Sequence, residues 1–98
     1  MNETPSKMEI NRWYKRGKRA YYGRFKNHFE IAVQWLEKAA KAGNKYAQYL
    51  LGMCYLRGEG VPKDDYTAYS WFRESGKNGH PDGRYLADDM LRVHEMML

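Results

Sequence analysis

The sequence lacks several features that mark common classes of protein. Its one cysteine, Cys54, cannot form an internal disulfide, which favours a reducing compartment. No stretch approaches the ~18 apolar residues of a membrane-spanning helix, and the N-terminal residues MNETPSKMEINRWYKRG contain no apolar run of signal-peptide length. We therefore expect a cytoplasmic protein without a membrane span.

Groups that carry catalysis or bind metals are also sparse. His28, His80 and His94 are far apart, and none has a histidine four residues further on or a neighbouring cysteine, as metal sites often do. The serines have no recognisable general base or oxyanion loop. We expect neither an enzyme nor a metal site nor a cofactor.

Aromatic residues, by contrast, are plentiful. The chain has 98 residues, enough for one domain, and among them are three Trp, nine Tyr and three Phe. Hydrophobic residues make up 43% and charged residues 30%, which is typical of a globular rather than a disordered chain. Large aromatic side chains let a small domain bury area with few residues.

Positive charge is concentrated near the N-terminus. Residues 1–26 hold eight Lys or Arg and two Glu, whereas residues 27–98 hold nine Lys or Arg and ten Asp or Glu. The segment RWYKRGKRAYYGRFK, residues 12–26, mixes cations with aromatics, a combination that can bind phosphate and stack on bases. Nucleic acid or an acidic surface is therefore an alternative partner. At 100° per residue, however, we expect its cations to spread around a helix rather than to form one stripe: Arg12, Lys15, Arg16, Lys18 and Arg19.

The chain repeats itself when it is shifted by 36 residues. The pairs that fall into register include Ala32 with Ala68, Trp35 with Trp71, Leu36 with Phe72, Gly43 with Gly79, Tyr49 with Tyr85 and Leu50 with Leu86. A weaker, earlier copy needs one loop residue fewer and matches Tyr14 with Tyr49, Gly17 with Gly52 and Gly23 with Gly58. A period in the mid-thirties with helical patterning indicates stacked helical hairpins.

Five helices are predicted, over about residues 7–22, 28–42, 45–57 and 66–78, and from residue 80 or 81 onward. Ser6 with Glu9 predicts a capping box at the first helix, and Asn27 with Glu30 predicts another at the second. Gly43 and Asn44 follow the second helix, and both tolerate left-handed backbone.

The stretch RGEGVPKDD reverses the chain between two antiparallel helices. Gly58 and Gly60 permit positive φ, Pro62 cannot continue the preceding helix, and Asp64 or Asp65 can cap the next one. A phosphate-binding loop is the competing interpretation, but the stretch lacks the Lys-Ser/Thr of a P-loop and no strand precedes it. Small residues on the adjoining helices predict close packing, with Gly52 at a contact and Cys54 buried.

Residues 32–68 resemble Sel1-like repeats, relatives of tetratricopeptide repeats. They match the pattern A-x-x-W-[LYF]-x-K-A-A-x-x-G-[ND]-x-x-A-Q-x-x-L-G-x-x-Y-x-x-G-x-G-V-x-x-D almost throughout, while residues 11–31 match weakly. The resemblance implies an all-α, right-handed α/α superhelix of about two helical hairpins and a C-terminal capping helix. We expect one domain, with a degenerate first repeat at 7–43, a well-matched repeat at 44–79 and the capping helix at 80–98.

Two departures from the pattern are informative. RESGKNG stands where x-K-A-A-x-x-G is usual, so Ser75 and Gly76 are expected to weaken that helix by roughly 1 kcal/mol. Some extracellular relatives carry cysteine pairs that bridge the two helices of a repeat. This chain has alanines at the matching positions, Ala40 and Ala47, so it is not expected to belong to that disulfide-rich branch.

The resemblance implies a non-catalytic scaffold or adaptor that binds a protein or peptide in a concave groove lined by the first helix of each hairpin. The partner-binding residues carried across are Tyr14, Lys18, Tyr21, Tyr22, Tyr46, Tyr49, Met53, Arg57, Tyr85 and Arg92, with Asn11, Leu56, Asp82, Asp89 and Val93 beside them. Tyr14, Tyr49 and Tyr85 are expected to form a ladder, with at least one of Tyr21 and Tyr22 exposed. Alternatively, the tyrosines only pack between helices. The apolar end HEMML also makes a homodimer through the last helix an open alternative.

Overall fold

The computed structural model describes residues 4–98, and every regular element in them is an α-helix. The helices are α1 (Lys7–Tyr21), α2 (His28–Lys41), α3 (Lys45–Arg57), α4 (Asp65–Lys77) and α5 (Pro81–Met96). The predicted all-α fold with five helices is confirmed, and the predicted bounds differ by about one residue at a helix end. Each helix packs chiefly on its neighbours in the chain, and α1 also touches α3.

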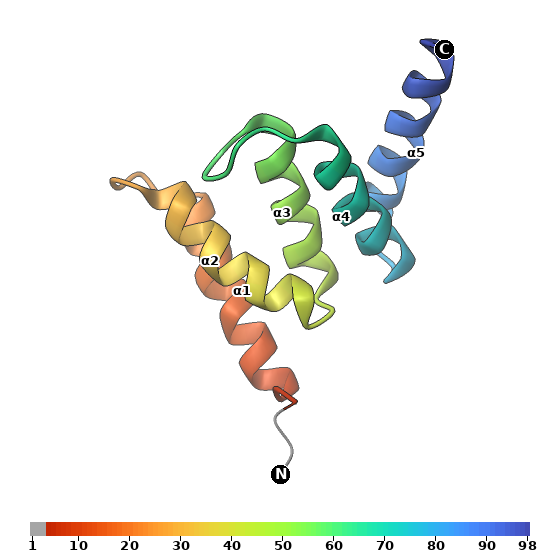
Figure 1. Cartoon of the computed structure of the whole chain (residues 1–98). Helices are drawn as coiled ribbons and strands as arrows, with labels where there is room; N and C mark the ends of the chain where they lie inside the picture. The colour runs from red at the N-terminus through yellow and green to blue at the C-terminus, as the bar shows by residue number, and fades with distance from the viewer. Residues whose placement is uncertain (1–3) are drawn as a thin grey trace.

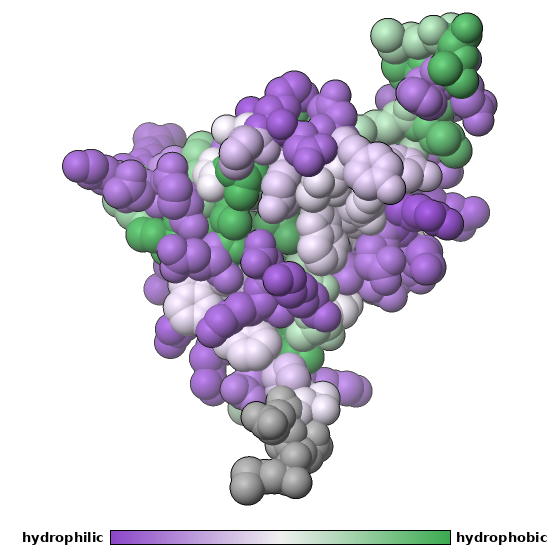
Figure 2. Space-filling model, in the orientation of Figure 1, coloured by the Kyte–Doolittle hydropathy of each residue, from purple (hydrophilic) through white to green (hydrophobic). Residues whose placement is uncertain are grey.

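The helices are stacked along one direction, so that the molecule is elongated. Its extents are 47 × 34 × 22 Å, and α1 and the far end of α5 lie at opposite ends of the stack (Figure 1). The radius of gyration is 13.8 Å, slightly above the ~13 Å of a compact domain of this size. The last turns of α5 stand clear of the other helices and carry strongly hydrophobic residues at their tip (Figure 2).

Polar groups at the helix ends explain where the helices begin. At α1 the capping box is present, because Ser6 Oγ accepts from the Glu9 amide at 3.1 Å and Glu9 Oε1 accepts from the Ser6 amide at 3.4 Å. Asp64 caps α4 by accepting from the Thr67 amide at 3.1 Å, which settles the choice between Asp64 and Asp65.

Two predicted roles for asparagine are wrong. Asn27 has a φ of 61°, and its side chain makes no cap hydrogen bond, since left-handed backbone turns that side chain away from the free amides of α2. Asn44 is extended, with a φ of −72°, and accepts from the Ala47 amide at 2.8 Å. Asn44 therefore starts α3, and Gly43 alone, at a φ of 100°, supplies the left-handed residue after α2.

Glycines set the distance between helices within each hairpin. A methyl group built on Gly17 would lie 2.7 Å from Leu36 Cδ2 of α2, and one on Gly52 would lie 2.7 Å from the Phe72 ring of α4. Leu36 and Phe72 are fully buried at these crossings. The predicted contact at Gly52 is confirmed, and Gly17 makes the corresponding one.

Ser75 and Gly76, expected only to weaken α4, make a close crossing with α5. A methyl group on Gly83 of α5 would lie 2.8 Å from Ser75 Oγ, and one on Gly76 would lie 2.7 Å from the Arg84 Cα. Ser75 Oγ also donates to the Lys45 carbonyl of α3 at 2.7 Å. Gly76 thus lowers the helix propensity of α4 but allows α5 to approach closely, and alanine at residue 76 would block that approach.

A buried amide joins three helices and was not predicted. Gln48, on α3, donates from Nε2 to the Ala40 carbonyl at 3.0 Å and accepts at Oε1 from Asn78 Nδ2 at 3.0 Å. The Gln48 side chain is buried, and a buried amide without hydrogen bonds destabilises a protein, so both bonds contribute to stability.

Candidate functional site

Four aromatic rings from α1, α3 and the start of α5 form a continuous row. The ring centroids of Tyr14 and Tyr46 are 5.7 Å apart, those of Tyr46 and His80 are 5.6 Å apart, and those of His80 and Tyr49 are 4.6 Å apart, stacked at 22°. These four residues are called the aromatic row below. It brings together positions that are up to 66 residues apart in the sequence.

The aromatic row differs from the predicted ladder of Tyr14, Tyr49 and Tyr85. Tyr46 and His80 fill the space between the first two tyrosines, whereas Tyr85 makes no ring contact with any residue in the range 4–98 and is 63% exposed. His80 enters because it is the N-cap of α5, which places its ring beside α3 rather than on the body of α5. Equivalent repeat positions therefore do not stack directly.

Tyr49 is both a packing residue and a surface residue. Its ring lies 5.8 Å from that of buried Phe72 and is stacked on His80, and the residue is half-buried. Burial raises the pKa of Tyr49, Asp82 raises it further, and Arg57 opposes the change. The expectation that this tyrosine packs between helices holds for one side of its ring.

Tyr21 and Tyr22 divide the two roles between them. Tyr21 is buried and donates from its hydroxyl to Glu59 at 3.5 Å, and burial, helped by Glu59, raises its pKa to about 12. Tyr22 is 66% exposed and rests edge-on against Tyr21 at 4.9 Å. As predicted, one of the pair is exposed, while Tyr21 is removed from the contact surface because neighbouring rings cover it.

Tyr22 links the two ends of the aromatic row. Its hydroxyl raises the pKa of Tyr14 after burial, and that of Tyr49 after burial and Asp82. Arg57 interacts with Tyr49 and with Tyr21 from the C-terminal end of α3. One face thus gathers tyrosine hydroxyls, half-exposed rings and a guanidinium.

The remaining predicted site residues are placed less centrally. Lys18 and Arg57 are exposed, and neither forms a salt bridge within residues 4–98. Met53 is half-buried and packs against both groups of core residues. Arg92 pairs with Asp89 at 2.6 Å on the exposed surface of α5, where the pair is one turn apart.

His80 is the ring in the row that sequence patterns did not mark. Its Nδ1 accepts from the Asp82 amide at 3.2 Å and so caps α5. Burial lowers its pKa, Lys45 lowers it further, and Asp82 opposes the change. The available signal was its position directly before Pro81, since proline favours the first helical residue.

The basic residues of α1 form a stripe, contrary to the expectation that they spread around the helix. Arg12, Lys15, Arg16 and Arg19 line a single shallow hollow, together with Met8 and Asn11. Their spacing of three, four and seven residues from Arg12 places them on one helix face, and only Lys18 falls elsewhere. These four cations are called the basic stripe below.

Aromatic rings beside the basic stripe are already covered by cations. The Arg16 guanidinium lies 4.9 Å from the Trp35 ring centroid, and Lys38 Nζ lies 5.5 Å from that of Trp13. Such contacts stabilise the α1–α2 pair by cation–π attraction. They leave these rings unavailable as platforms for stacked bases.

Reactive chemistry has little support in the described residues. Cys54 is buried, and burial raises its pKa to about 12, which keeps the thiol in its unreactive neutral form. Within residues 4–98, no group of three His, Cys, Asp or Glu side chains is arranged to hold a metal ion. In the same part of the chain no helix is both long and apolar enough to cross a membrane.

Comparison with known proteins identifies the repeat. The model of the Sel1 repeat matches residues 12–44 and again residues 45–80. A Sel1 repeat protein from Oxalobacter formigenes has a crystal structure that superposes with a TM-score of 0.76 and 29% identity, over 83% of this chain and 24% of that one.

Two curated proteins are similar in sequence. Chitin synthase regulatory factor 3 of Schizosaccharomyces pombe is 30% identical over 79 residues, which are 81% of this chain and 8% of that protein. An uncharacterized protein of Neisseria meningitidis serogroup B is 40% identical over 58 residues, which are 59% of this chain and 12% of that protein. The chain thus spans about a tenth of the curated relatives it matches.

Proposed function

Since the chain belongs to the Sel1 repeat family, whose domains are generally protein–protein interaction scaffolds and typically non-catalytic, we propose that it is a cytoplasmic adaptor that binds a partner polypeptide on the face carrying the aromatic row. The observation that carries this proposal is the continuous row of half-exposed rings. Exposed Lys18 lies one helical turn from Tyr14, and Tyr22 one turn further. Arg57 acts on Tyr49 from the end of α3. Tyrosine offers an apolar face and a polar tip, and tyrosine and arginine are enriched among residues that dominate binding.

Charge defines the partner segment that suits this face. Lys18 and Arg57 form no salt bridge within residues 4–98, so a carboxylate of a partner meets cations that need not first break an ion pair. Hydrogen bonds between a guanidinium and a carboxylate are stronger than neutral ones. The partner segment is accordingly an acidic peptide, or a chain terminus, with an apolar residue for the ring surface.

Affinity capture with the immobilised full chain tests the proposal. The double variant Tyr22→Ala/Arg57→Ala changes two exposed residues and should lower recovery of the partner at least tenfold. Arg24→Ala/Phe25→Ala is the matched control, because it removes an exposed cation and an exposed aromatic from the α1–α2 loop. Each variant loses one edge-on ring contact, Tyr22 with Tyr21 or Phe25 with His28, so both should lose a similar ~0.5–1.5 kcal/mol of stability, which their melting curves check. Equal loss of the partner in both variants would refute the proposal.

Tyr49→Ala is a poorer test than sequence alone indicated. Its ring contacts with Phe72 and His80 are part of the packing, so that this variant should lose about 1–2 kcal/mol of stability as well as binding. Loss of the partner in Tyr49→Ala therefore has no meaning without its melting curve.

A second candidate function follows from the basic stripe. Four cations on one face of α1 suit an acidic protein surface, and the covered rings of Trp13 and Trp35 argue against bases as the ligand. Retention on heparin in a salt gradient tests it, with Arg12→Glu against the control Lys18→Glu, each of which lowers the net charge by two. Equal elution of the two variants would remove the basic stripe from consideration, and capture of single-stranded DNA would favour nucleic acid instead.

A further inference from the structure

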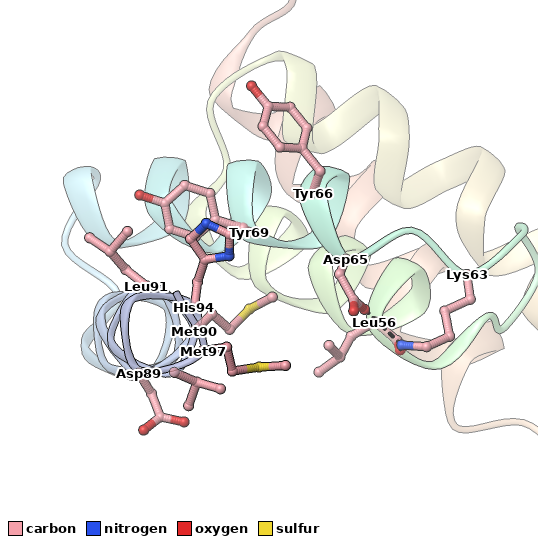
Figure 3. A pocket seen from close by; sticks show the side chains of 11 residues that line it. Leu56, Lys63, Asp65, Tyr66, Tyr69, Asp89, Met90, Leu91, His94 and Met97 are labelled. Atoms are coloured by element: carbon pink, nitrogen blue, oxygen red, sulfur yellow. Dashed lines mark hydrogen bonds and ion pairs between the residues drawn. The ribbon is translucent and has the colours of Figure 1, made fainter.

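A groove between α4 and the outer half of α5 has no equivalent in the first repeat. It has a volume of about 660 Å³, and its apolar lining includes Leu56, Tyr69, Met90, Val93 and Met97. Met90 and Met97 point from α5 toward the side where Leu56 and the ion pair of Lys63 with Asp65 lie (Figure 3). This surface is called the α4–α5 groove below, and it lies outside the aromatic row.

The repeat shows what covers the corresponding surface one unit earlier. Shifting the sequence by 36 residues places Asp65, Tyr69 and Met90 on Phe29, Val33 and Cys54, and the 35-residue register of the weaker copy places Leu56 on Tyr21. All four residues of the later set line the α4–α5 groove. All four of the earlier set lie in the first core, where a loop covers them.

That loop is the segment Glu59, Gly60 and Val61. A methyl group on Gly60 would lie 2.6 Å from the Phe29 carbonyl oxygen and 3.0 Å from Val33 Cγ2, so the backbone itself rests on α2. Val61 packs into the first core, and Glu59 accepts from the Tyr21 hydroxyl at 3.5 Å. A short bent stretch, with a left-handed glycine (φ 78°) before an aliphatic residue, thus fills the earlier site.

The second site stays open because α5 does not turn. Its residues 93–97 correspond to 57–61, but they continue as helix to Met96 instead of reversing at a glycine. His94 stands where the earlier helix has Gly58, whose φ is 68°. The helical extension therefore forms one wall of the groove that the loop would have filled.

A further helix could not pack on α5 in the way that α4 packs on α3. Asp88 occupies the position of Gly52 and Gly17, where even a methyl group would lie 2.7 Å from the facing helix. A carboxylate there blocks that crossing. The α4–α5 groove therefore suits a loop, such as residues 59–61 in the first repeat, and not another helix packed as in a hairpin.

We propose that the α4–α5 groove binds a short bent segment of another polypeptide, with a left-handed glycine followed by an aliphatic residue, in the way Gly60 and Val61 cover α2. Leu56 stands where Tyr21 offers its hydroxyl to Glu59, so the occupant has an apolar residue before its glycine. The two methionines adapt to irregular shapes, which suits a short segment of varied sequence.

The probe is a peptide with the sequence of residues 56–65 that carries Glu59→Leu, and the control peptide carries Val61→Asp in addition. Methyl NMR of the full chain follows the resonances of Met90 and Met97 during each titration. Because short peptides lose entropy on ordering, the same peptide is also tethered after Leu98 by a flexible Gly/Ser linker, which raises its effective concentration to about the millimolar range.

Two neighbouring methionines supply matched protein variants. Met97 lines the groove and is 81% exposed, whereas Met96 does not line it and is 80% exposed. We expect saturable shifts of Met90 and Met97 with the probe, a dissociation constant raised at least tenfold by Met97→Glu, and one changed less than twofold by Met96→Glu.

Three results would overturn the proposal. Unchanged methyl resonances in the tethered chain would show that the groove does not take such a segment. Equal shifts with the Val61→Asp peptide would show that no aliphatic residue is recognised. Shifts that depend on protein concentration alone would show that the groove is covered by a second copy of the chain. None of these measurements uses the aromatic row, so its role is tested independently.

Discussion

At Gly52 the distance between α3 and α4 is set by a missing methyl group. The Phe72 ring occupies the space that a Cβ atom would need, and Phe72 is fully buried. Sequence patterns predicted this contact because small residues line the adjoining helices and allow them to approach closely. A glycine inside a helix costs about 1 kcal/mol relative to alanine, and the close approach of Phe72 explains why it stands here.

Gly52→Ala should destabilise the protein even though alanine favours helix. Overpacking a core costs about 1–3 kcal/mol, which outweighs the gain in propensity. We expect a net loss of up to about 2 kcal/mol in urea unfolding, and a smaller loss when Phe72→Leu is present as well, because the smaller side chain makes room. Independent, additive effects of the two substitutions would contradict the contact.

His80 couples the aromatic row to pH. Its Nδ1 must be unprotonated to accept from the Asp82 amide, and burial lowers its pKa. The folded protein therefore binds fewer protons than the unfolded chain near the ordinary histidine pKa of about 6.5. Stability is then retained above that pH and lost as the pH falls toward the lower folded pKa.

The melting temperature should thus fall between pH 7.5 and 5.5 in the wild type. His80→Asn keeps a side chain that caps helices well but does not titrate, and the fall should be smaller in this variant. Losing the cap and the ring contacts on protonation is worth about 1 kcal/mol. Parallel pH profiles for the two proteins would show that His80 does not cause the dependence.

At the scale of single helices, the sequence predicted existence and length better than the details of the ends. The four predicted bounds around α2 and α3 were within one residue of those observed, because glycine and asparagine separate strongly periodic segments. The capping box at Asn27 was wrong because the pattern specifies residue types and not the φ of the first residue. An asparagine with left-handed backbone, as observed at Asn27, satisfies the same sequence pattern.

Substitutions at Asn27 distinguish left-handed backbone from a side-chain cap. Asn27→Gly should keep or slightly raise stability, since glycine adopts a φ of 61° without strain. Asn27→Ser should lower it by up to about 1 kcal/mol, because serine caps well but tolerates left-handed backbone poorly. Thermal unfolding checks both, and the reverse order of the two variants would restore the capping box.

For the molecule as a whole, the repeat predicted the fold and only part of the candidate site. The all-α architecture followed from the 36-residue period, and exposure of one of Tyr21 and Tyr22 was also anticipated. The aromatic row was not, because His80 reaches it through the start of α5 and Tyr46 lies outside the repeated tyrosine position. Contacts between elements depend on crossing angles, which a sequence period does not specify.

The basic stripe was missed for a different reason. The run of cations in the sequence also contains Lys18, which lies on another helix face and obscures the alignment of the other four: Arg12, Lys15, Arg16 and Arg19. Spacings of three and four residues carry the signal on a helix, whereas the run of cations along the sequence does not. The repeat boundaries at 43 and 79, the cytoplasmic location and a homodimer through α5 stay predictions.

Backbone hydrogen exchange of the chain with and without its captured partner tests the central claim most directly, since it locates the partner on the surface. We predict that complex formation slows exchange in α1, α3 and the start of α5, around Tyr14, Tyr22, Tyr46 and Tyr49. Exchange in α2 and α4 should be unchanged. Protection confined to α2 and α4, with α1 and α3 exchanging as in the free protein, would contradict the account.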